Sequence, residues 1–403
     1  MGKIYDIAVL GAGVAGVMAT YRLLQNGAKD ICLIEFGRPP GKRRKQLEGW
    51  FGCFPYSNAR LYFENDYQKV KKISGIKKLK PVFDDVIDLM SEHGSLEKIK
   101  IKIPNKNIID KIKKTNSILS IDEYCQWKPE NIHSLSRRIA ENVENSSDVD
   151  TVFDTEVNEI DEKNGVFVLT TEHGEMRAKR LLLCFGRSGW RFAKDFFNKL
   201  GLSKNDDLST FGFRAELSTS YMKDWNKSHC TIAHDDMKIG PLSWNGTIIP
   251  EDHNDFVISS WRSNEDRWKT EKVAFSVMIS KKFKGMGLSQ TERLGKLAFV
   301  LADNRVGKGR LKDYLNGNFD ISIVPEYDWI KANIGYLNKI FPLFSEKAYF
   351  HVPDIHTDIP KIKLGNNFDT ENENLFVAGE NAGVSGLISA MTSGFIAADG
   401  LSK

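Results

Sequence analysis

Cysteine and histidine are scarce in this sequence, and neither is arranged as a cluster. The 403 residues include five cysteines, an odd number, and none is spaced as CxxC. We therefore expect a reducing compartment, no disulfide framework and no cysteine-ligated zinc. The eight histidines are dispersed without ligand spacing, so we predict no metal site.

Long apolar runs and a dominant charge are also missing. No stretch approaches the roughly 18 apolar residues of a membrane-spanning helix. The apolar start IYDIAVLGAGVAGV is interrupted by Asp6 and glycines, unlike a signal peptide. The net charge is only +4, so no overall basic field favours a nucleic-acid or membrane partner. With 41% apolar and 27% charged residues, the composition indicates a soluble globular protein, and we expect it in the cytoplasm.

The first 35 residues predict a strand, a glycine turn, a helix and a second strand. Residues 3–10, KIYDIAVL, are short and rich in β-branched residues, as in a buried parallel strand. A helix should follow the GAGVAG turn and end at Asn26-Gly27, where a left-handed conformation is tolerated. Residues 30–35, DICLIE, form a second apolar run that ends in an acid. This is a βαβ unit of about thirty residues.

The glycine turn has the spacing of a dinucleotide-binding fingerprint. Gly11 permits the tight turn, Gly13 lets the backbone approach a pyrophosphate, and Gly16 lets the helix pack closely on the strand. The pyrophosphate would face free N–H groups at the positive end of a helix dipole. Glu35 ends the second strand, where a carboxylate can accept hydrogen bonds from ribose hydroxyls and disfavours a 2′-phosphate. The predicted contacts are Gly11, Ala12, Gly13, Val14, Ala15, Gly16, Glu35 and Phe36.

The rest of the chain predicts a two-lobed organisation, because its length exceeds one ordinary core. From about 37 to 130 the α/β rhythm is lost, first in an aromatic loop and then in a lysine-rich stretch. Helices are expected at 131–145 and 289–304. The fold class is α/β, a Rossmann-type domain with an inserted α+β substrate lobe. Its expected segments are 1–49, 131–207 and 356–403 for the dinucleotide-binding domain, 50–130 for an inserted segment and 208–355 for the substrate lobe.

Two later segments favour FAD over NAD, by resemblance. RLLLCFGRSG (180–189) resembles the strand and small-residue turn by which glutathione-reductase-type flavoproteins return to the FAD domain. LFVAGENAGVSGLISAMTSGFIAADGL (375–401) resembles their C-terminal motif, in which an acid binds the ribityl chain and a helix faces the flavin. Glu380 stands where Asp is usual. The resemblance adds Val157, Phe185, Gly186, Gly379, Glu380, Gly386, Leu387 and Ile388 as cofactor contacts.

The wider pattern resembles the NAD/FAD-utilising dehydrogenases, uncharacterised FAD-dependent enzymes among the glutathione-reductase-type Rossmann flavoproteins. SNARLYF (57–63), FGRSGWRFAKDFFNKLG (185–201), GFRAEL (212–217) and GENAGVSGLISAMTSG (379–394) are similar to its segments. The family's cysteine-containing Pro-Gly-Gly segment corresponds to PLSWNGTII (241–249), which lacks cysteine. The resemblance implies an FAD-dependent oxidoreductase, and thiol-assisted chemistry is not expected.

The sequence names no catalytic residue, and two arginines are candidates. Arg60 lies in the aromatic loop, where it could flank the flavin, bind pyrophosphate or an anionic substrate, or make an ordinary ion pair. Arg214 and Glu216 alternate on one predicted strand and should face the same side. A structural salt bridge at the lobe interface is the favoured interpretation of that pair. The run 42–45, Lys-Arg-Arg-Lys, could contact the FAD phosphates or the substrate, but a solvated charge run is the favoured interpretation.

Three functional hypotheses follow. The first is an FAD-dependent oxidoreductase acting on a small planar or anionic metabolite at the junction of the lobes. Only one dinucleotide fingerprint is present, so either the substrate reduces the flavin or transient NAD(P)H or a protein donor does. The second makes the substrate a nucleotide, a tRNA or a DNA base, bound by the 13 lysines among residues 69–114. The third is a non-catalytic, FAD-binding redox sensor.

Overall fold

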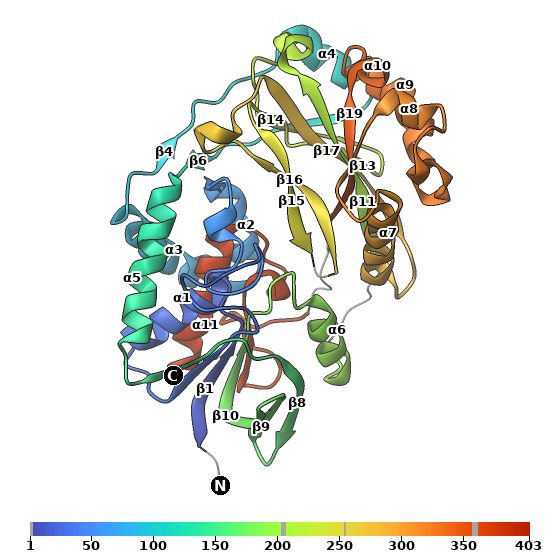
Figure 1. The fold of residues 1–403 in the computed structure, drawn as a ribbon. Helices are drawn as coiled ribbons and strands as arrows, with labels where there is room; N and C mark the ends of the chain where they lie inside the picture. Colours follow the sequence, from blue (N-terminus) through green and yellow to red (C-terminus); the bar gives the residue numbers. More distant parts are fainter. Residues whose placement is uncertain (1–2, 203–206, 254, 357–361) are drawn as a thin grey trace. The chain divides into compact units, whose positions relative to one another are not determined.

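The computed structural model describes residues 3–202, 207–253, 255–356 and 362–403 (Figure 1). The chain divides into two compact units. The first unit comprises Met1–Lys98, Tyr124–Lys204 and Ile359–Lys403, and the second comprises Ile99–Glu123 and Asn205–Asp358. Much of the stretch expected as an inserted segment, 50–98 and 124–130, therefore belongs to the unit that contains the glycine turn.

A parallel sheet forms the centre of the first unit. Its strand order is β7-β2-β1-β10-β20, and every neighbouring pair is parallel. The strand β2 is buried along its whole length, and so are the last four residues of β1, as expected for strands covered on both faces. The bounds are β1 (Ile4–Leu10), β2 (Ile31–Ile34), β7 (Val149–Val152), β10 (Gly174–Leu183) and β20 (Leu375–Val377).

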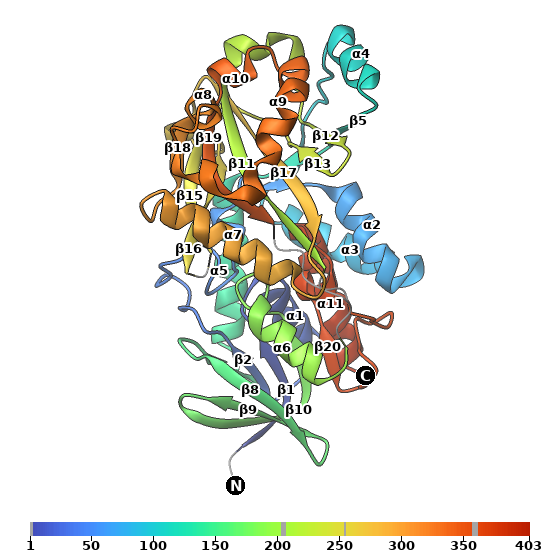
Figure 2. The ribbon, with the colours of Figure 1, turned by 90° about the vertical axis from the view of Figure 1, so that its right-hand side faces the viewer.

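This strand order is that of a doubly wound α/β sheet. The chain starts at β1, moves outward through β2 and β7, and returns to the other side of β1 with β10 and β20. Ligands in such sheets bind beyond the carboxyl ends of the strands where the winding direction changes, here between β1 and β10. The first half of β10 also pairs with an antiparallel hairpin of β8 (Val157–Lys163) and β9 (Val166–Thr171), which Figure 2 shows beside it.

The helix α1 (Val14–Gln25) connects β1 to β2 and packs against α11 (Leu387–Leu401). Their contact is close because both helices present small residues. A Cβ built on Gly394 would lie 2.3 Å from the carbonyl oxygen of Ala15. The remaining elements of this unit are η1 (Phe54–Tyr56), β3 (Arg60–Leu61), α2 (Phe63–Ser74), α3 (Ile76–Ser91), β4 (Glu97–Lys98), β6 (Cys125–Gln126), α5 (Pro129–Glu144), α6 (Trp190–Lys199) and η6 (Gly379–Ala382).

The lysine-rich stretch is more regular than its sequence indicated. It forms the second half of α2, all of α3 and, in the second unit, α4 (Lys106–Lys114). Lysine favours helices, and α3 and α4 each bury apolar residues at helical spacing, for example Val82, Val86 and Leu89 on α3. In the sequence, the frequent lysines between these apolar residues obscure the helical periodicity.

The second unit is built on an antiparallel sheet of order β18-β19-β11-β17-β13-β12-β5, with β14 paired to β17. Its core contains many aromatic side chains, including Phe213, Phe275 and Phe341. The α/β class with an inserted α+β unit is thus confirmed. Bounds are β5 (Ile118–Ile121), β11 (Leu208–Ser218), η2 (Thr219–Trp225), β12 (Cys230–His234), β13 (Met237–Ile239), β14 (Ser243–Trp244), β15 (Thr247–His253), β16 (Phe256–Arg262), η3 (Asp266–Trp268), β17 (Lys272–Lys282), α7 (Gly287–Leu301), β18 (Gly307–Arg310), α8 (Leu311–Leu315), η4 (Asp320–Ile323), η5 (Pro325–Tyr327), α9 (Trp329–Ile340), α10 (Phe344–Lys347) and β19 (Tyr349–His356).

Three kinds of feature are absent from the described residues: disulfide bonds, clusters of metal-ligating side chains, and helices long and apolar enough to cross a membrane. All five cysteines there are free thiols. No group of three or more His, Cys, Asp or Glu side chains in these residues is placed to hold a metal ion. Among the described helices, none combines the length and the apolar character needed to cross a bilayer.

Candidate functional site

The three fingerprint glycines are glycine for different reasons. A Cβ on Gly11, whose φ is +100°, would lie 2.4 Å from the carbonyl oxygen of Cys184. A Cβ on Gly16 would lie 1.9 Å from the carbonyl oxygen of Gly11. A Cβ on Gly13 would meet only the carbonyl oxygen of Cys184, at 4.0 Å, and the φ of Gly13 is an ordinary −68°. The packing of the chain therefore demands glycine at positions 11 and 16 but not at 13, where the open space suits a ligand.

The N-terminus of α1 opens onto this space. The first N–H groups of a helix have no partner within the helix. In the described residues no side chain accepts a hydrogen bond from the N–H groups of Val14, Ala15 or Gly16, and Gly13 offers no capping side chain. Free N–H groups at the positive end of a helix dipole are able to bind an anion, and here they lie beside Gly13.

Glu35 accepts hydrogen bonds from three backbone N–H groups. Its carboxylate is 6% exposed. Oε2 accepts from the N–H of Ala12 at 2.6 Å, and Oε1 accepts from the N–H groups of Gly37 and Gly49 at 2.8 and 2.9 Å. A carboxylate has about four acceptor positions, so about one remains for a ribose hydroxyl. Glu35 thus joins the glycine turn to the loop that follows β2.

That loop also contacts the turn directly. The N–H of Phe51 donates to the carbonyl of Ala12 at 2.7 Å, and a Cβ on Gly52 would lie 3.3 Å from the Cα of Gly13. Arg43 holds the loop's shape by donating to the carbonyls of Glu48 at 3.0 Å and Trp50 at 2.7 Å. Burial lowers the pKa of Arg43. The run 42–45 is therefore not entirely a solvated charge run, since Arg43 organises the loop.

The ends of β10 and β20 meet beside the same turn. The N–H of Cys184 donates to the carbonyl of Leu10 at 2.8 Å. Asn381, fully buried, accepts from the N–H of Gly186 at 2.9 Å, which fixes the turn after β10 to the turn after β20. The side chain of Glu380 is 24% exposed, and its Oε2 lies 3.6 Å from Nε of Arg187.

Gly379 connects this region to α1. Its N–H donates to Oγ of Ser393 at 2.9 Å, and a Cβ there would lie 3.0 Å from the Cβ of Ala15. The structure therefore brings the N-terminal and C-terminal motifs together around α1.

The N-terminus of α11 is capped, unlike that of α1. Asp66 of α2 is 2% exposed and accepts from the N–H groups of Ile388 and Ser389 at 3.1 and 3.3 Å. Lys69 lies 3.2 Å from the same carboxylate and donates to the carbonyl of Ser385. Burial raises the pKa of Asp66, and the charge of Lys69 opposes that shift. Ile388, predicted as a cofactor contact, thus has its N–H bonded within the chain.

The remaining predicted contacts lie apart from the glycine turn's hydrogen bonds. Phe36 is 44% exposed after β2, and Val157 begins β8. Phe36 follows Glu35 directly, and Val157 lies two residues after Thr155. The N–H of Thr155 donates to the carbonyl of Glu35 at 3.2 Å, so this hydrogen bond links the two segments. Arg60 lies on β3, with its guanidinium 5.2 Å from the ring of Tyr124. Arg214 belongs to the second unit.

Four residues that shape this region were not predicted as contacts. Asn381, adjacent to Glu380, and Arg187, within the quoted segment 185–201, stood in recognised motifs without an assigned role. Asp66 and Lys69 lie in a stretch of alternating charges, where nothing distinguishes a buried carboxylate from a solvated one. Only the tertiary packing of α2 on α11 reveals them.

In the second unit, the two charged residues of β11 face the same side but do not pair with each other. Nη2 of Arg214 lies 3.3 Å from Asp354, which is 3% exposed and also accepts from Ser276 at 2.7 Å. Glu216, 4% exposed, lies 2.8 Å from Lys272 and 3.5 Å from Lys308. Burial opposes ionisation of Glu216, but these lysines hold its pKa below the ordinary value.

His351 lies beside Glu216 and is predicted to make stability sensitive to acid. Burial lowers its pKa to about 4, against 6.5 for an ordinary histidine. The folded state therefore disfavours protonation, so its contribution is complete above pH 6.5 and is lost as the pH falls towards 4. The loss is at most about 3.5 kcal/mol at 1.4 kcal/mol per pKa unit. We expect the free energy of unfolding of His351→Gln, measured with urea, to depend less on pH between 6.5 and 4.5 than that of the wild type. An unchanged pH dependence would contradict this.

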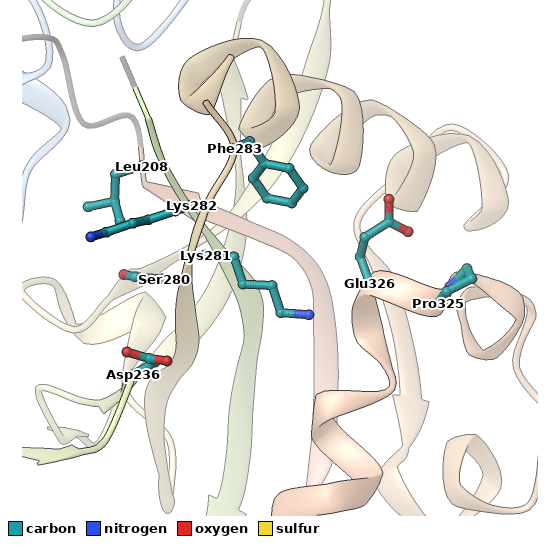
Figure 3. A pocket seen from close by; sticks show the side chains of 8 residues that line it. All are labelled: Leu208, Asp236, Ser280, Lys281, Lys282, Phe283, Pro325 and Glu326. Carbon is teal, nitrogen blue, oxygen red and sulfur yellow. The ribbon is translucent and has the colours of Figure 1, made fainter. Parts of the chain in front are cut away.

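A separate open hollow of about 660 Å³ lies at the end of β17 in the second unit (Figure 3). Lys281 extends between the strand and Glu326, and Phe283 lies on the same side. None of the residues predicted from sequence lines it. The lining residues are Leu208, Asp236, Ser280, Lys281, Lys282, Phe283, Pro325 and Glu326.

Comparison with known proteins shows only distant similarity. No protein-family model matches the chain, and no curated protein sequence is similar to it. A glycine oxidase from Geobacillus kaustophilus is 13% identical with a TM-score of 0.42, over 99% of this chain and 95% of that one. CtdE, in complex with FAD and a substrate, is 11% identical with a TM-score of 0.40, over 96% and 78%. At these identities and TM-scores the similarity carries no argument about cofactor or activity.

Proposed function

We propose that this protein is an FAD-dependent oxidoreductase that acts on a small planar or anionic metabolite. The observation that carries the proposal is Gly13. It is the one fingerprint glycine whose lack of a side chain the packing does not require, and it lies before an uncapped helix N-terminus. A pyrophosphate needs this combination of close backbone approach and N–H donors.

The residues of the first unit fit such a cofactor. The N–H groups that begin α1 would hold the pyrophosphate, and the remaining acceptor position of Glu35 would hold the ribose of the adenosine half. Glu380, which is partly exposed beside Arg187, would accept from the ribityl hydroxyls. Bound flavin would supply hydride or electron transfer, while the chain orients the reactants and excludes water. The choice of FAD over another dinucleotide rests on the resemblance of 375–401 to the flavoprotein C-terminal motif.

The direct test is the absorbance of the purified protein. We expect a yellow protein with a flavin spectrum, and release of FAD rather than FMN on denaturation. Anaerobic addition of NADH, NADPH and candidate metabolites would then show which donor bleaches the flavin. A colourless protein that does not take up FAD would refute the proposal. A yellow protein that no donor reduces would instead support the sensor hypothesis.

Glu380→Ala should change the flavin more than the fold. The substitution removes a negative charge beside Arg187, so formation of the reduced, anionic flavin becomes more favourable. We expect weaker FAD retention and a reduction potential that is more positive by about 30 mV. For a two-electron couple this corresponds to a tenfold change in the equilibrium constant for reduction. Stability should change by less than about 1 kcal/mol because both side chains are partly exposed. Unchanged FAD content and potential would contradict the assignment.

A further inference from the structure

The lysine-rich stretch is divided between the two units, and its lysines differ in their surroundings. In the first unit, Lys69 pairs with Asp66 and Lys80 pairs with Asp84. In the second unit, residues 99–118 carry six exposed lysines, and none of the six has a hydrogen-bond or ion-pair partner among the described residues. We call 99–118 the basic segment. Its lysines are Lys100, Lys102, Lys106, Lys111, Lys113 and Lys114.

The charge of the basic segment is not neutralised by its neighbours. Six lysines and Asp110 give the segment a net charge of +5. The elements packed against α4 are β5, η2 and α9, and Figure 2 shows α4 next to β5. These elements add three lysines and one aspartate, a further +2. Two acids lie at each end of β5, and subtracting these four leaves a net charge of +3. They are Asp235 and Asp236 at one end, and Asp122 and Glu123 at the other.

Exposed isoleucines flank the lysines of α4 on both sides. The helix buries Ile108 and Ile112 against the second unit, which leaves its lysines exposed to solvent. Ile101 and Ile103, which precede the helix, are 40% and 54% exposed, and Ile118, which follows it, is 69% exposed. A single exposed isoleucine needs no explanation. Three of them within a segment of this charge make a surface that is both basic and apolar.

We propose that the basic segment docks the protein on an anionic membrane surface, with its lysines at the headgroups and Ile101 and Ile103 in the interfacial layer. Clustered lysines beside exposed apolar side chains are typical of peripheral binding to anionic lipids. Nucleic-acid surfaces use arginine as well as lysine, and they stack aromatic side chains on single-stranded bases. The basic segment contains neither arginine nor an aromatic residue, which favours lipid. This inference is independent of the proposed function.

Co-sedimentation of the purified protein with lipid vesicles tests the proposal. The protein should sediment with vesicles of phosphatidylserine and phosphatidylcholine in equal parts. Phosphatidylcholine vesicles should bind it at least about tenfold more weakly, because each lysine near an anionic surface strengthens binding about fivefold. Added salt should release the protein, since it screens these charges.

Two double substitutions change the net charge equally but in different units. Lys113→Glu with Lys114→Glu, in the basic segment, should weaken binding to the phosphatidylserine vesicles at least about tenfold. Lys72→Glu with Lys77→Glu is the matched control, because both lysines are exposed and belong to α2 and α3 of the first unit. We expect that control to change binding by less than about threefold, through overall charge alone.

Ile103→Ser tests the apolar contribution. It should weaken vesicle binding severalfold, whereas Ile76→Ser, at a position that is 55% exposed on α3, should leave it unchanged. Equal binding to both kinds of vesicle, an equal loss in the two charge-reversed proteins, or unchanged binding of Ile103→Ser would overturn the proposal. Binding to a single-stranded oligonucleotide without binding to phosphatidylserine vesicles would also overturn it, in favour of a nucleic-acid partner. Circular dichroism and thermal unfolding establish that each variant is folded.

Discussion

Gly13→Glu is expected to yield a folded protein without flavin. A Cβ at position 13 has no protein atom closer than 4.0 Å, and the φ of −68° suits any residue. The glutamate would extend into the space before α1 and place a negative charge where the pyrophosphate belongs. Repulsion between the glutamate and the pyrophosphate, together with the volume that the side chain occupies, should remove FAD binding entirely. The absorbance ratio of flavin to protein measures it.

Two further variants make the Gly13 result specific. Gly335→Glu makes the same substitution in α9, where a Cβ also meets no atom within 4 Å, and it should leave flavin content unchanged. Gly16→Ala should instead damage the fold, since its Cβ would lie 1.9 Å from the carbonyl oxygen of Gly11. A yellow, fully occupied Gly13→Glu protein would show that the cofactor lies elsewhere.

Glu35→Gln is expected to destabilise the first unit and weaken FAD together. Three backbone N–H groups converge on this carboxylate from Ala12, Gly37 and Gly49. An amide has one acceptor oxygen, so whichever way it turns, its NH₂ group faces at least one of these donors. Hydrogen bonds to a charged acceptor contribute about 1.5–3 kcal/mol each, and we expect a loss of about 3 kcal/mol or more. Urea unfolding measures the loss.

A second measurement separates the two roles of Glu35. If the carboxylate only bound ribose, Glu35→Gln would lower FAD affinity without changing the stability of the flavin-free protein. We expect the stability loss to persist after the flavin is removed. Glu175→Gln is the control, because Glu175 is an exposed residue of β10 paired with Arg177, and its loss should cost less than about 1 kcal/mol.

The βαβ unit was predictable because its signals are local. The strand predicted at 3–10 is Ile4–Leu10, and the helix closed by Asn26-Gly27 is Val14–Gln25. Both follow from apolar runs and from glycines whose backbone conformation few other residues adopt, such as Gly27 with a φ of +76°. The helices expected at 131–145 and 289–304 also exist, within about two or three residues at each end.

The partners of the charged residues were not predictable in the same way. Arg214 and Glu216 were expected on one face of a strand, and they are, but their ion partners come from β19, β17 and β18. Those strands lie more than fifty residues further along the chain, and a strand's own pattern gives its faces but not its neighbours. Asp66 illustrates the same limit, because its partners on α11 are about 320 residues away.

The packing of α11 on α1 has a consequence for how the protein is made. The sheet around β1 and β10 lacks β20, and Ala15 lacks the cover of Gly394, until residues 375–401 have left the ribosome. At 5–20 residues per second this interval is about 20–80 s after β1 emerges. Through that time the apolar face of α1 is exposed, so we expect the nascent chain to depend on chaperones and to capture its cofactor only after translation.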